Sequence, residues 1–158
     1  MPRERGEKII ATNRRARHDY AIEKTYEAGL VLRGTEVKSL REGRANLTDG
    51  YAYIAGGEAF LDAVNIPEYS QGHWTNHSSK RTRKLLLHKA EIVKLSHAVA
   101  AGGYTLIPLK LYFSDGRAKV EIAVAKGMRE YEKRQTIRER EDRREAERAM
   151  RSKNRLGD

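Results

Sequence analysis

The stretch that decides the fold is Gly103-Tyr-Thr-Leu-Ile-Pro-Leu-Lys-Leu-Tyr-Phe-Ser-Asp-Gly-Arg-Ala-Lys-Val-Glu-Ile-Ala-Val-Ala-Lys-Gly127. Its second half alternates, with Ala118, Val120, Ile122 and Val124 on one face and Arg117, Lys119 and Glu121 on the other. This period of two predicts a half-buried strand. Aliphatic and aromatic residues fill positions 104–113, and Ser114-Asp115-Gly116 supplies a turn, so we expect an antiparallel hairpin. Pro108 cannot donate to a strand ladder, which predicts a sheet edge or a bulge there.

The residues before this hairpin predict further strands and one short helix. Positions 8–12 read as a short strand, 13–19 as a basic turn or single helical turn, and 20–32 as a long strand. In the long strand only Lys24 interrupts the apolar face, and Gly29 suggests a bend or bulge. Over 34–44 we expect a helix with Thr35 as N-cap and Gly43 as its stop.

The middle of the chain predicts a hairpin, a loop and a second helix. Positions 46–65 form two strands around Gly56-Gly57, and 67–79 form a long loop that carries Trp74. Leu86, Ala90, Val93, His97 and Ala101 recur at helical spacing within 85–101, and Gly102-Gly103 ends that helix.

The order of these elements predicts a mainly β chain with helices, in the α+β class. Strands, helix, strands, helix and strands follow one another over residues 1–127. We expect a small antiparallel OB-like β-barrel whose ends are covered by helices.

Residues 128–158 predict a separate tail, because their few apolar residues cannot form a core. Possible i,i+4 pairs such as Glu130–Arg134, Glu139–Arg143 and Glu147–Arg151 are each worth only ~0.2–0.5 kcal/mol. A lone helix of this kind is marginal in water, so we expect a tail that is disordered when free and helical against a partner. The alternative is a permanently formed, solvated helix.

The charge of the chain indicates a polyanionic partner. Residues 127–158 hold 11 Lys or Arg against 8 Asp or Glu, so +7 of the net +10 belongs to the body. Basic clusters at 14–17 and 80–84 favour nucleic acid over the alternative that the charge only maintains solubility. Neither cluster lies on a helix with a large apolar face, which argues against a membrane partner.

Several kinds of chemistry are not visible in the sequence. The chain has no cysteine, which excludes a disulfide scaffold and a thiolate metal site. His73 and His77 have i,i+4 spacing but no third ligand nearby, so we predict no metal and no cofactor. No phosphate-binding loop or nucleophile elbow is present, and we expect no catalytic residues and no enzyme. Without a signal peptide or a membrane-length apolar run, we expect a soluble cytoplasmic protein.

Five segments together resemble the small protein B family, the SsrA-binding proteins of bacterial trans-translation. They are residues 11–20, 27–30, 34–41 and 81–88, and the stretch from Gly103-Tyr104-Thr105 to Ala125-Lys126-Gly127. The resemblance implies a barrel that binds the tRNA-like domain of transfer-messenger RNA (tmRNA) near its D-loop. It also implies a tail that enters the decoding site and mRNA channel of a stalled ribosome. The protein would replace the anticodon arm, so that the nascent chain is tagged for proteolysis and the ribosome is released.

The resemblance also implies which residues touch each partner. RNA-contact positions carry over to Asn13, Tyr20, Glu27, Leu87 and Gly127, with basic support from Arg81, Arg83 and Lys84. We also expect RNA contacts from Arg14 and Lys126. Ribosome-binding tail positions carry over to Arg129, Tyr131, Glu132, Lys133, Arg134 and Met150. Core packing is the alternative for Tyr20 and Leu87, and an exposed strand carboxylate is the alternative for Glu27.

This chain departs from the family pattern at four places. Met128-Arg129 stands where relatives carry two lysines, and Glu132-Lys133-Arg134 where many carry Asp-Lys-Arg, so charge is mostly kept. Ala149-Met150 weakens the usual apolar anchor, and His77-Ser78-Ser79 changes one loop. A rival function is a general single-stranded nucleic-acid binder, which needs aromatic platforms along its groove. A more distant rival is an RNA-processing enzyme.

Overall fold

The structure, a computed structural model, describes residues 6–70, 76–127 and 130–156, and the side chains of 137–151 in the last helix. The chain divides into two compact units, Met1–Gly127 and Met128–Asp158. The elements of the first unit are β1 (Glu7–Thr12), α1 (Ala16–Asp19), β2 (Tyr20–Leu30), α2 (Gly34–Arg41), β3 (Tyr51–Ala55), β4 (Glu58–Asp62), β5 (Arg83–Leu86), α3 (Lys89–Ala100), β6 (Tyr104–Ser114) and β7 (Arg117–Gly127). The second unit holds α4 (Glu130–Leu156).

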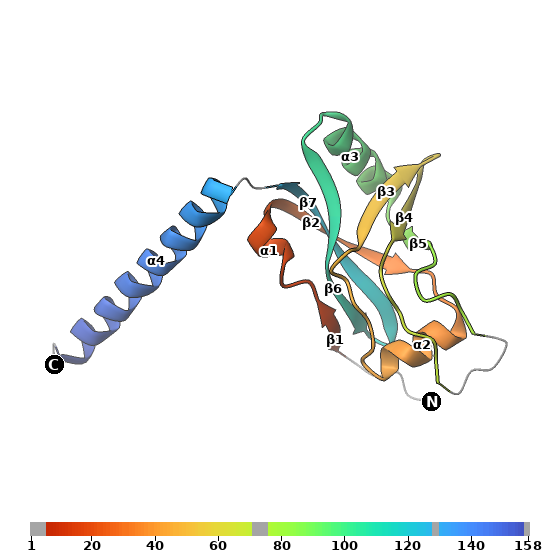
Figure 1. Cartoon of the computed structure of the whole chain (residues 1–158), viewed down its shortest axis with the longest axis horizontal. Helices are drawn as coiled ribbons and strands as arrows, with labels where there is room; N and C mark the ends of the chain where they lie inside the picture. The colour runs from red at the N-terminus through yellow and green to blue at the C-terminus, as the bar shows by residue number, and fades with distance from the viewer. Residues whose placement is uncertain (1–5, 71–75, 128–129, 157–158) are drawn as a thin grey trace. The chain divides into compact units, whose positions relative to one another are not determined.

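Six antiparallel strands close into a barrel in the order β6-β3-β4-β5-β2-β7, because β7 also pairs with β6. The strand β1 continues beyond β3 along the other edge of β6. The helices α2 and α3 lie at opposite ends of this barrel (Figure 1). These observations confirm the predicted OB-like barrel with flanking helices.

The hairpin of β6 and β7 forms as predicted. Asp115 and Gly116 have φ of 49° and 81°, the left-handed conformations of a two-residue hairpin turn that matches the twist of the strands. Val120, Ile122 and Val124 are buried in the main core, which also receives Leu40 from α2, Leu95 from α3 and the inward residues of the other strands.

A second, smaller core lies on the opposite face of β7, and the sequence pattern did not predict it. It contains Ala16 of α1, Ile107, Leu109, Ala123 and Ala125. The register of β6 shifts between Pro108 and Lys110, which confirms the predicted bulge. Before the shift the even-numbered Leu106 faces the main core, and after it the odd-numbered Leu111 and Phe113 do, because one extra residue reverses the side-chain alternation.

In β2 the bulge lies between Ile22 and Lys24 instead of at Gly29. Gly29 pairs regularly with Leu86 on one side and Lys119 on the other. A Cβ atom on Gly29 would lie 3.1 Å from the Cβ of Leu86, so this glycine permits close packing of two strands.

The predicted start of α2 is also corrected. The N-cap is Arg33, whose N–H donates to the Glu36 carboxylate at 2.8 Å, and Thr35 lies inside the helix. Gly43, with φ of 76°, follows the helix as predicted.

The predicted helix over 85–101 starts too early, because residues 85 and 86 belong to strand β5, which spans Arg83–Leu86. Leu85 pairs with both Leu30 and Ala59, so the gap between β2 and β4 determines its conformation. The helix α3 begins only at Lys89 and buries Leu95, while Leu86 and Val93, on the predicted apolar face, are exposed.

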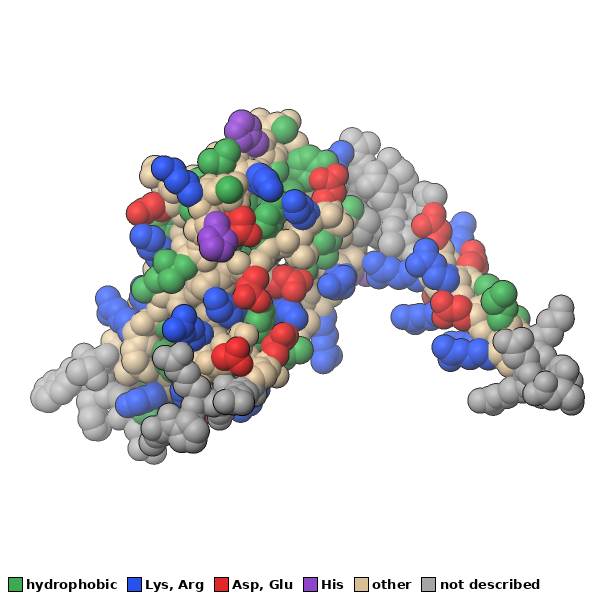
Figure 2. Space-filling view, turned by 180° about the vertical axis from the view of Figure 1, so that it is seen from behind, with side chains coloured by type: hydrophobic (Ala, Val, Ile, Leu, Met, Phe, Trp, Pro, Cys, Tyr) green, Lys and Arg blue, Asp and Glu red, His purple; other side chains and the backbone are tan. Residues whose placement is uncertain are grey.

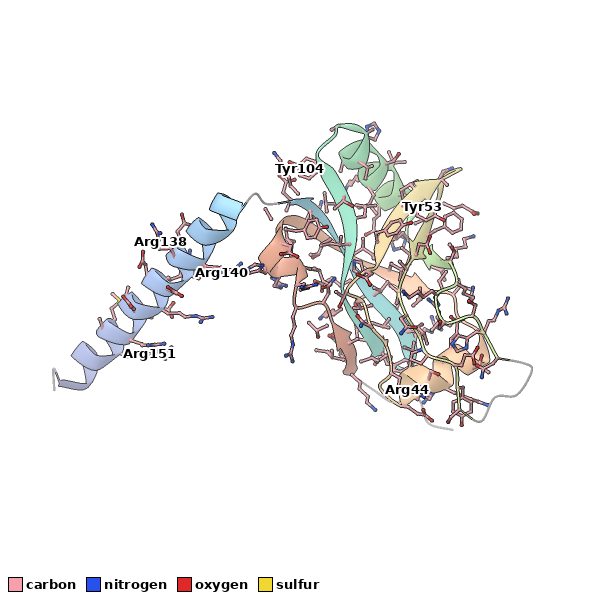
Figure 3. The ribbon with its side chains drawn as sticks, in the orientation of Figure 1. Arg44, Tyr53, Tyr104, Arg138, Arg140 and Arg151 are labelled. Carbon is pink, nitrogen blue, oxygen red and sulfur yellow. The ribbon has the colours of Figure 1, made fainter. Side chains whose placement is uncertain are left out.

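The tail is the 27-residue helix α4, and every side chain described along it is exposed. Figure 3 shows Arg138, Arg140 and Arg151 extending from its surface. Disorder of this segment in the free protein stays a prediction. None of the helices in the described part of the chain combines the length and apolar character needed to cross a membrane.

Gly50 packs tightly against Val64 and Pro108, which gives a prediction about stability. A Cβ atom there would lie 2.6 Å from Val64 Cγ2 and 2.9 Å from Pro108 Cγ. We expect Gly50→Ala to lower the free energy of unfolding by about 1–3 kcal/mol through overpacking. Chemical denaturation measures it. Gly34→Ala is the matched control, since its Cβ would meet nothing within 4 Å; equal stabilities of the two variants would contradict the prediction.

Candidate nucleic-acid interface

Three of the predicted RNA-contact residues line one groove of about 780 Å³ in the barrel surface: Glu27, Lys84 and Leu87. The groove walls come from the end of β2, the segment joining β5 to α3, and the start of β7. These distant parts of the sequence meet because β2 pairs with β5 on one edge and with β7 on the other.

Acidic and basic side chains share the groove. Lys84 Nζ lies 3.1 Å from Glu58 Oε1, and Lys119 Nζ lies 3.9 Å from Glu27 Oε1. Ion pairs this exposed contribute about 0–1 kcal/mol, so either lysine can exchange its carboxylate for a phosphate at little cost. Leu87 is half-buried and packs against the main core, so core packing accounts for part of its role.

A second group of predicted residues gathers around α1. Asn13 and Tyr20 line a hollow of about 360 Å³ between α1 and residues 48–51. Tyr20 also packs against the second core, and it pairs with Gly127 at the end of β7. Lys126 lies beside it and is exposed, as is Arg14.

Asn13 is itself buried, and its side-chain amide forms hydrogen bonds within the barrel. Its side-chain N–H donates to Pro108 O at 3.0 Å and to Leu47 O at 3.4 Å, and its oxygen accepts from Ala16 N at 3.2 Å. Asn13 therefore holds α1 against the barrel and positions the hollow. A direct contact with RNA stays a prediction.

The basic cluster at 80–84 is partly internal, which corrects its predicted role. Arg83 is fully buried and donates to the Glu36 carboxylate, to Val64 O at 2.8 Å and to Ser79 O at 3.1 Å. Arg81 is half-buried, and its Nε donates to the same carboxylate at 3.0 Å. Arg83 therefore cannot serve as a surface cation, and Lys84 is the member of this cluster that lines the groove.

We call Glu36, Arg81 and Arg83 the buried clamp. Burial by itself raises the pKa of Glu36, but hydrogen bonds from Arg81, the Arg33 backbone and Arg83 outweigh it and hold the pKa below its ordinary value. Burial lowers the pKa of Arg83, and Glu36 opposes that shift. The clamp ties α2 to β5 and to the loop before it.

His77, at the end of the predicted long loop, is buried. Its ring lies 2.9 Å from Thr35 Oγ1 through Nδ1 and 2.9 Å from Ile66 O through Nε2. It fixes the loop against α2. His73 and Trp74 lie outside the described residues, and within the described ones no group of three His, Cys, Asp or Glu is placed to hold a metal.

The predicted tail residues are placed less fully. Tyr131, Glu132, Lys133 and Arg134 belong to α4, but only their backbone is described, and Arg129 lies outside the described residues. Met150 is 70% exposed, which leaves it available as an apolar contact.

Sequence reasoning missed two groove residues, Arg117 and Lys119. Their outward positions were visible in the alternation of β7, but the pairing of β7 with β2, which brings Lys119 to the same groove as Glu27, was not. Figure 2 shows one face of the molecule on which Lys and Arg side chains are interspersed with Asp and Glu. Such a surface can contact phosphates through its cations and base or sugar donors through its carboxylates.

Comparisons with known proteins agree along most of the chain. The family described as SmpB protein matches residues 10–152. The SsrA-binding protein of Clavibacter michiganensis is 70% identical over 158 residues, covering all of both chains. That of Streptomyces coelicolor is 63% identical over 150 residues, covering 95% of this chain and 94% of the relative.

A solved structure described as "tmRNA-SmpB: a journey to the center of the bacterial ribosome" contains a similar chain. The two superpose with a TM-score of 0.65 and 46% sequence identity, covering 81% of this chain and 94% of that one.

The buried clamp generates a prediction about stability. We expect Glu36→Gln to lower the free energy of unfolding at pH 7 by about 3–5 kcal/mol, because it leaves Arg83 buried without its counter-charge. The pKa of Glu36 is lower in the folded than in the unfolded state. Its contribution is therefore complete above the unfolded value of about 4.3 and is lost as the pH falls through the folded value.

Denaturant titrations at pH 7, 5 and 3.5 measure this difference, which should narrow toward acid. Glu58→Gln is the control, because it removes an exposed partner of Lys84 and should cost less than about 1 kcal/mol. A Glu36→Gln effect that does not change with pH would refute the assignment.

Proposed function

This chain belongs to the SmpB protein family, and we propose that it binds tmRNA through its barrel and delivers it to stalled ribosomes in trans-translation. The observation that carries the proposal is the groove, where Glu27 meets Lys84 and Leu87 although it lies far from them in the sequence. The names of the full-length relatives, and of the chain that superposes on the barrel, support the same partners.

We propose that the barrel recognises the tRNA-like domain as a folded object. Lys84, Lys119 and Arg117 supply phosphate contacts along the groove, while Glu27 supplies an acceptor that a phosphate cannot use. Sequence-tolerant phosphate contacts combined with a few base or sugar contacts suit structured RNA better than a simple polyanion.

For the tail we propose a role on the ribosome. The helix α4 is covered with charged side chains and buries none of those described, so it lacks the apolar stripe that would pack it on a protein core. Alternating Arg and Glu residues instead suit a surface rich in ribosomal RNA and protein. In this role the protein replaces the anticodon arm.

We also propose that the protein acts without catalysing a reaction of its own, in the cytoplasm where ribosomes translate. The family's RNA-binding character supports an adaptor, and the residues at the groove serve recognition without the paired nucleophile and base of an enzyme site.

One observation favours the rival reading as a single-stranded nucleic-acid binder. Tyr51, Tyr53 and Phe60 gather on the outer face of β3 and β4, with ring centroids 6.2 and 5.5 Å apart. However, Glu58 and Asp62 place carboxylates at the two ends of β4, beside Phe60, and Tyr51 donates to Asp62. Repulsion of phosphates by these carboxylates makes this platform the weaker candidate. Competition with an unstructured RNA of equal length distinguishes the two functions.

The groove cations predict a salt-dependent affinity. We expect binding of the tRNA-like domain to weaken steeply with salt, and Lys84→Gln to reduce the slope of log K against log salt by about one. At 0.1 M salt the variant should bind up to about tenfold more weakly, the equivalent of about 1.4 kcal/mol. Gel-shift titrations over a range of salt concentrations provide the measurement.

Arg44→Gln is the matched control for Lys84→Gln. The Arg44 side chain is 46% exposed and paired with Glu42, and that of Lys84 is 45% exposed and paired with Glu58. Arg44 lies beyond the end of α2 (Figure 3). Equal losses of affinity and slope in the two variants would show that net charge, and not the groove, determines binding.

Removal of the tail separates the two proposed roles. A chain ending at Gly127 keeps the entire barrel, so we expect its affinity for the tRNA-like domain to stay within about twofold of the full chain. Tagging of nascent chains on stalled ribosomes should be abolished in a reconstituted translation assay. Loss of RNA affinity on truncation would overturn this division of roles.

A further inference from the structure

In the sheet, Glu27 occupies a position where a carboxylate does not favour the stability of the fold. In the pairing of β2 with β7 it stands directly opposite Glu121, and like charges opposite each other destabilise an antiparallel pair. The Glu27 side chain is nevertheless 55% exposed and lines the groove. A local rule broken at a surface site indicates a functional requirement.

One oxygen of this carboxylate is held by a buried phenol. Tyr112 of β6 is 3% exposed, and its hydroxyl donates to Glu27 Oε2 at 2.5 Å. The Tyr112 ring is fixed in turn by Lys110, whose Nζ lies 4.8 Å from the ring centroid. Burial, helped by the hydrogen bond to Glu27, raises the pKa of Tyr112, so the phenol keeps the proton it donates at neutral pH.

The other oxygen remains available toward the groove. Glu27 Oε1 lies 3.9 Å from Lys119 Nζ, which is beyond hydrogen-bond distance but close enough to stabilise the negative charge. An ionised carboxylate only accepts hydrogen bonds, and it repels phosphate. The RNA groups that satisfy it are N–H donors on base edges and the ribose 2′-hydroxyl.

We propose that Tyr112 is a positioning residue for RNA recognition: its hydroxyl holds Glu27 Oε2 so that Oε1 accepts a hydrogen bond from a base N–H or a ribose hydroxyl. The inference rests on the proposed binding of tmRNA through the groove. It adds a residue that acts through Glu27 from beneath the RNA-facing surface.

A double-mutant cycle tests this role. The full-length wild type, Tyr112→Phe, Glu27→Gln and the double variant are titrated with the tRNA-like domain of tmRNA and with an unrelated hairpin RNA. We expect Tyr112→Phe to weaken binding of the tRNA-like domain by about three- to tenfold, as for one lost hydrogen bond. In the Glu27→Gln background the same change should alter affinity by less than about twofold, because Tyr112 acts through Glu27.

The salt dependence separates this role from a loss of structure or of phosphate contacts. Tyr112→Phe removes no cation, so the slope of log K against log salt should equal that of the wild type. Thermal unfolding checks that the variant is folded. Should it not fold, Glu27→Asp serves instead, because the shortened carboxylate keeps its charge but retreats from Tyr112, and we expect about the same three- to tenfold loss.

Tyr104→Phe is the matched control, because it removes the same kind of bond between the same two strands. The Tyr104 hydroxyl donates to Glu23 Oε1 at 2.9 Å, outside the groove. We expect its affinity to stay within about twofold of the wild type. RNAs that each carry a single 2′-deoxy substitution identify the donor. If the effect of Tyr112→Phe disappears with one of these RNAs, the donor is the ribose hydroxyl that this RNA lacks. If the effect persists with all of them, the donor is a base N–H.

Additive losses from Tyr112→Phe and Glu27→Gln, an unchanged affinity of Tyr112→Phe, or wild-type affinity of Glu27→Asp would overturn the inference. A wild type that binds the hairpin RNA as tightly as the tRNA-like domain would instead overturn the proposed function itself.

Discussion

The pairing of β7 along both of its edges is the constraint on which the rest of the structure depends. The eleven-residue strand β7 pairs with β2 on one side and with β6 on the other, which closes the barrel. Its inward residues contribute to the main core, and Ala123 and Ala125 on its opposite face contribute to the second core under α1. The same pairing aligns the outward-facing Lys119 and Glu121 with Glu27, so the strand that closes the fold also builds one wall of the groove.

The positive charge of the barrel serves two physically different purposes. Arg83 and much of Arg81 are taken into the interior, where Glu36 and backbone carbonyls satisfy them and join α2 to the sheet. Lys84 and Lys119 remain at the surface in weak, exposed pairs that RNA can replace. Net charge therefore overstates the cationic surface offered to a nucleic acid, and part of a basic sequence cluster stabilises the fold.

How far sequence reasoning succeeded depended on the range of the forces involved. Hairpins were predicted because turn residues and alternation act over a few positions, as at Asp115-Gly116. The helical spacing from Leu86 to Ala101 was misleading at its start, because Leu85 and Leu86 pair with β2 and Leu85 also pairs with β4, so both residues belong to a strand. The bulge in β2 was misplaced, since Gly29 signals close packing as readily as a bulge. In the candidate site, Glu27 and Leu87 were identified by resemblance to a family and Lys84 by its basic cluster, whereas the roles of Lys119 and Tyr112 became visible only in the tertiary structure.

The sequence by itself determined the class of the fold, the boundary between an apolar body and a charged tail, and the net positive charge, because these follow from composition and short periodicities. Only the tertiary structure decided which charged side chains face solvent and which oppose one another across strands. That information resides in strand register, where a shift of one residue moves a side chain to the opposite face. Arg83 and Lys84 are neighbours in the chain, yet alternation along β5 buries the first and leaves the second in the groove.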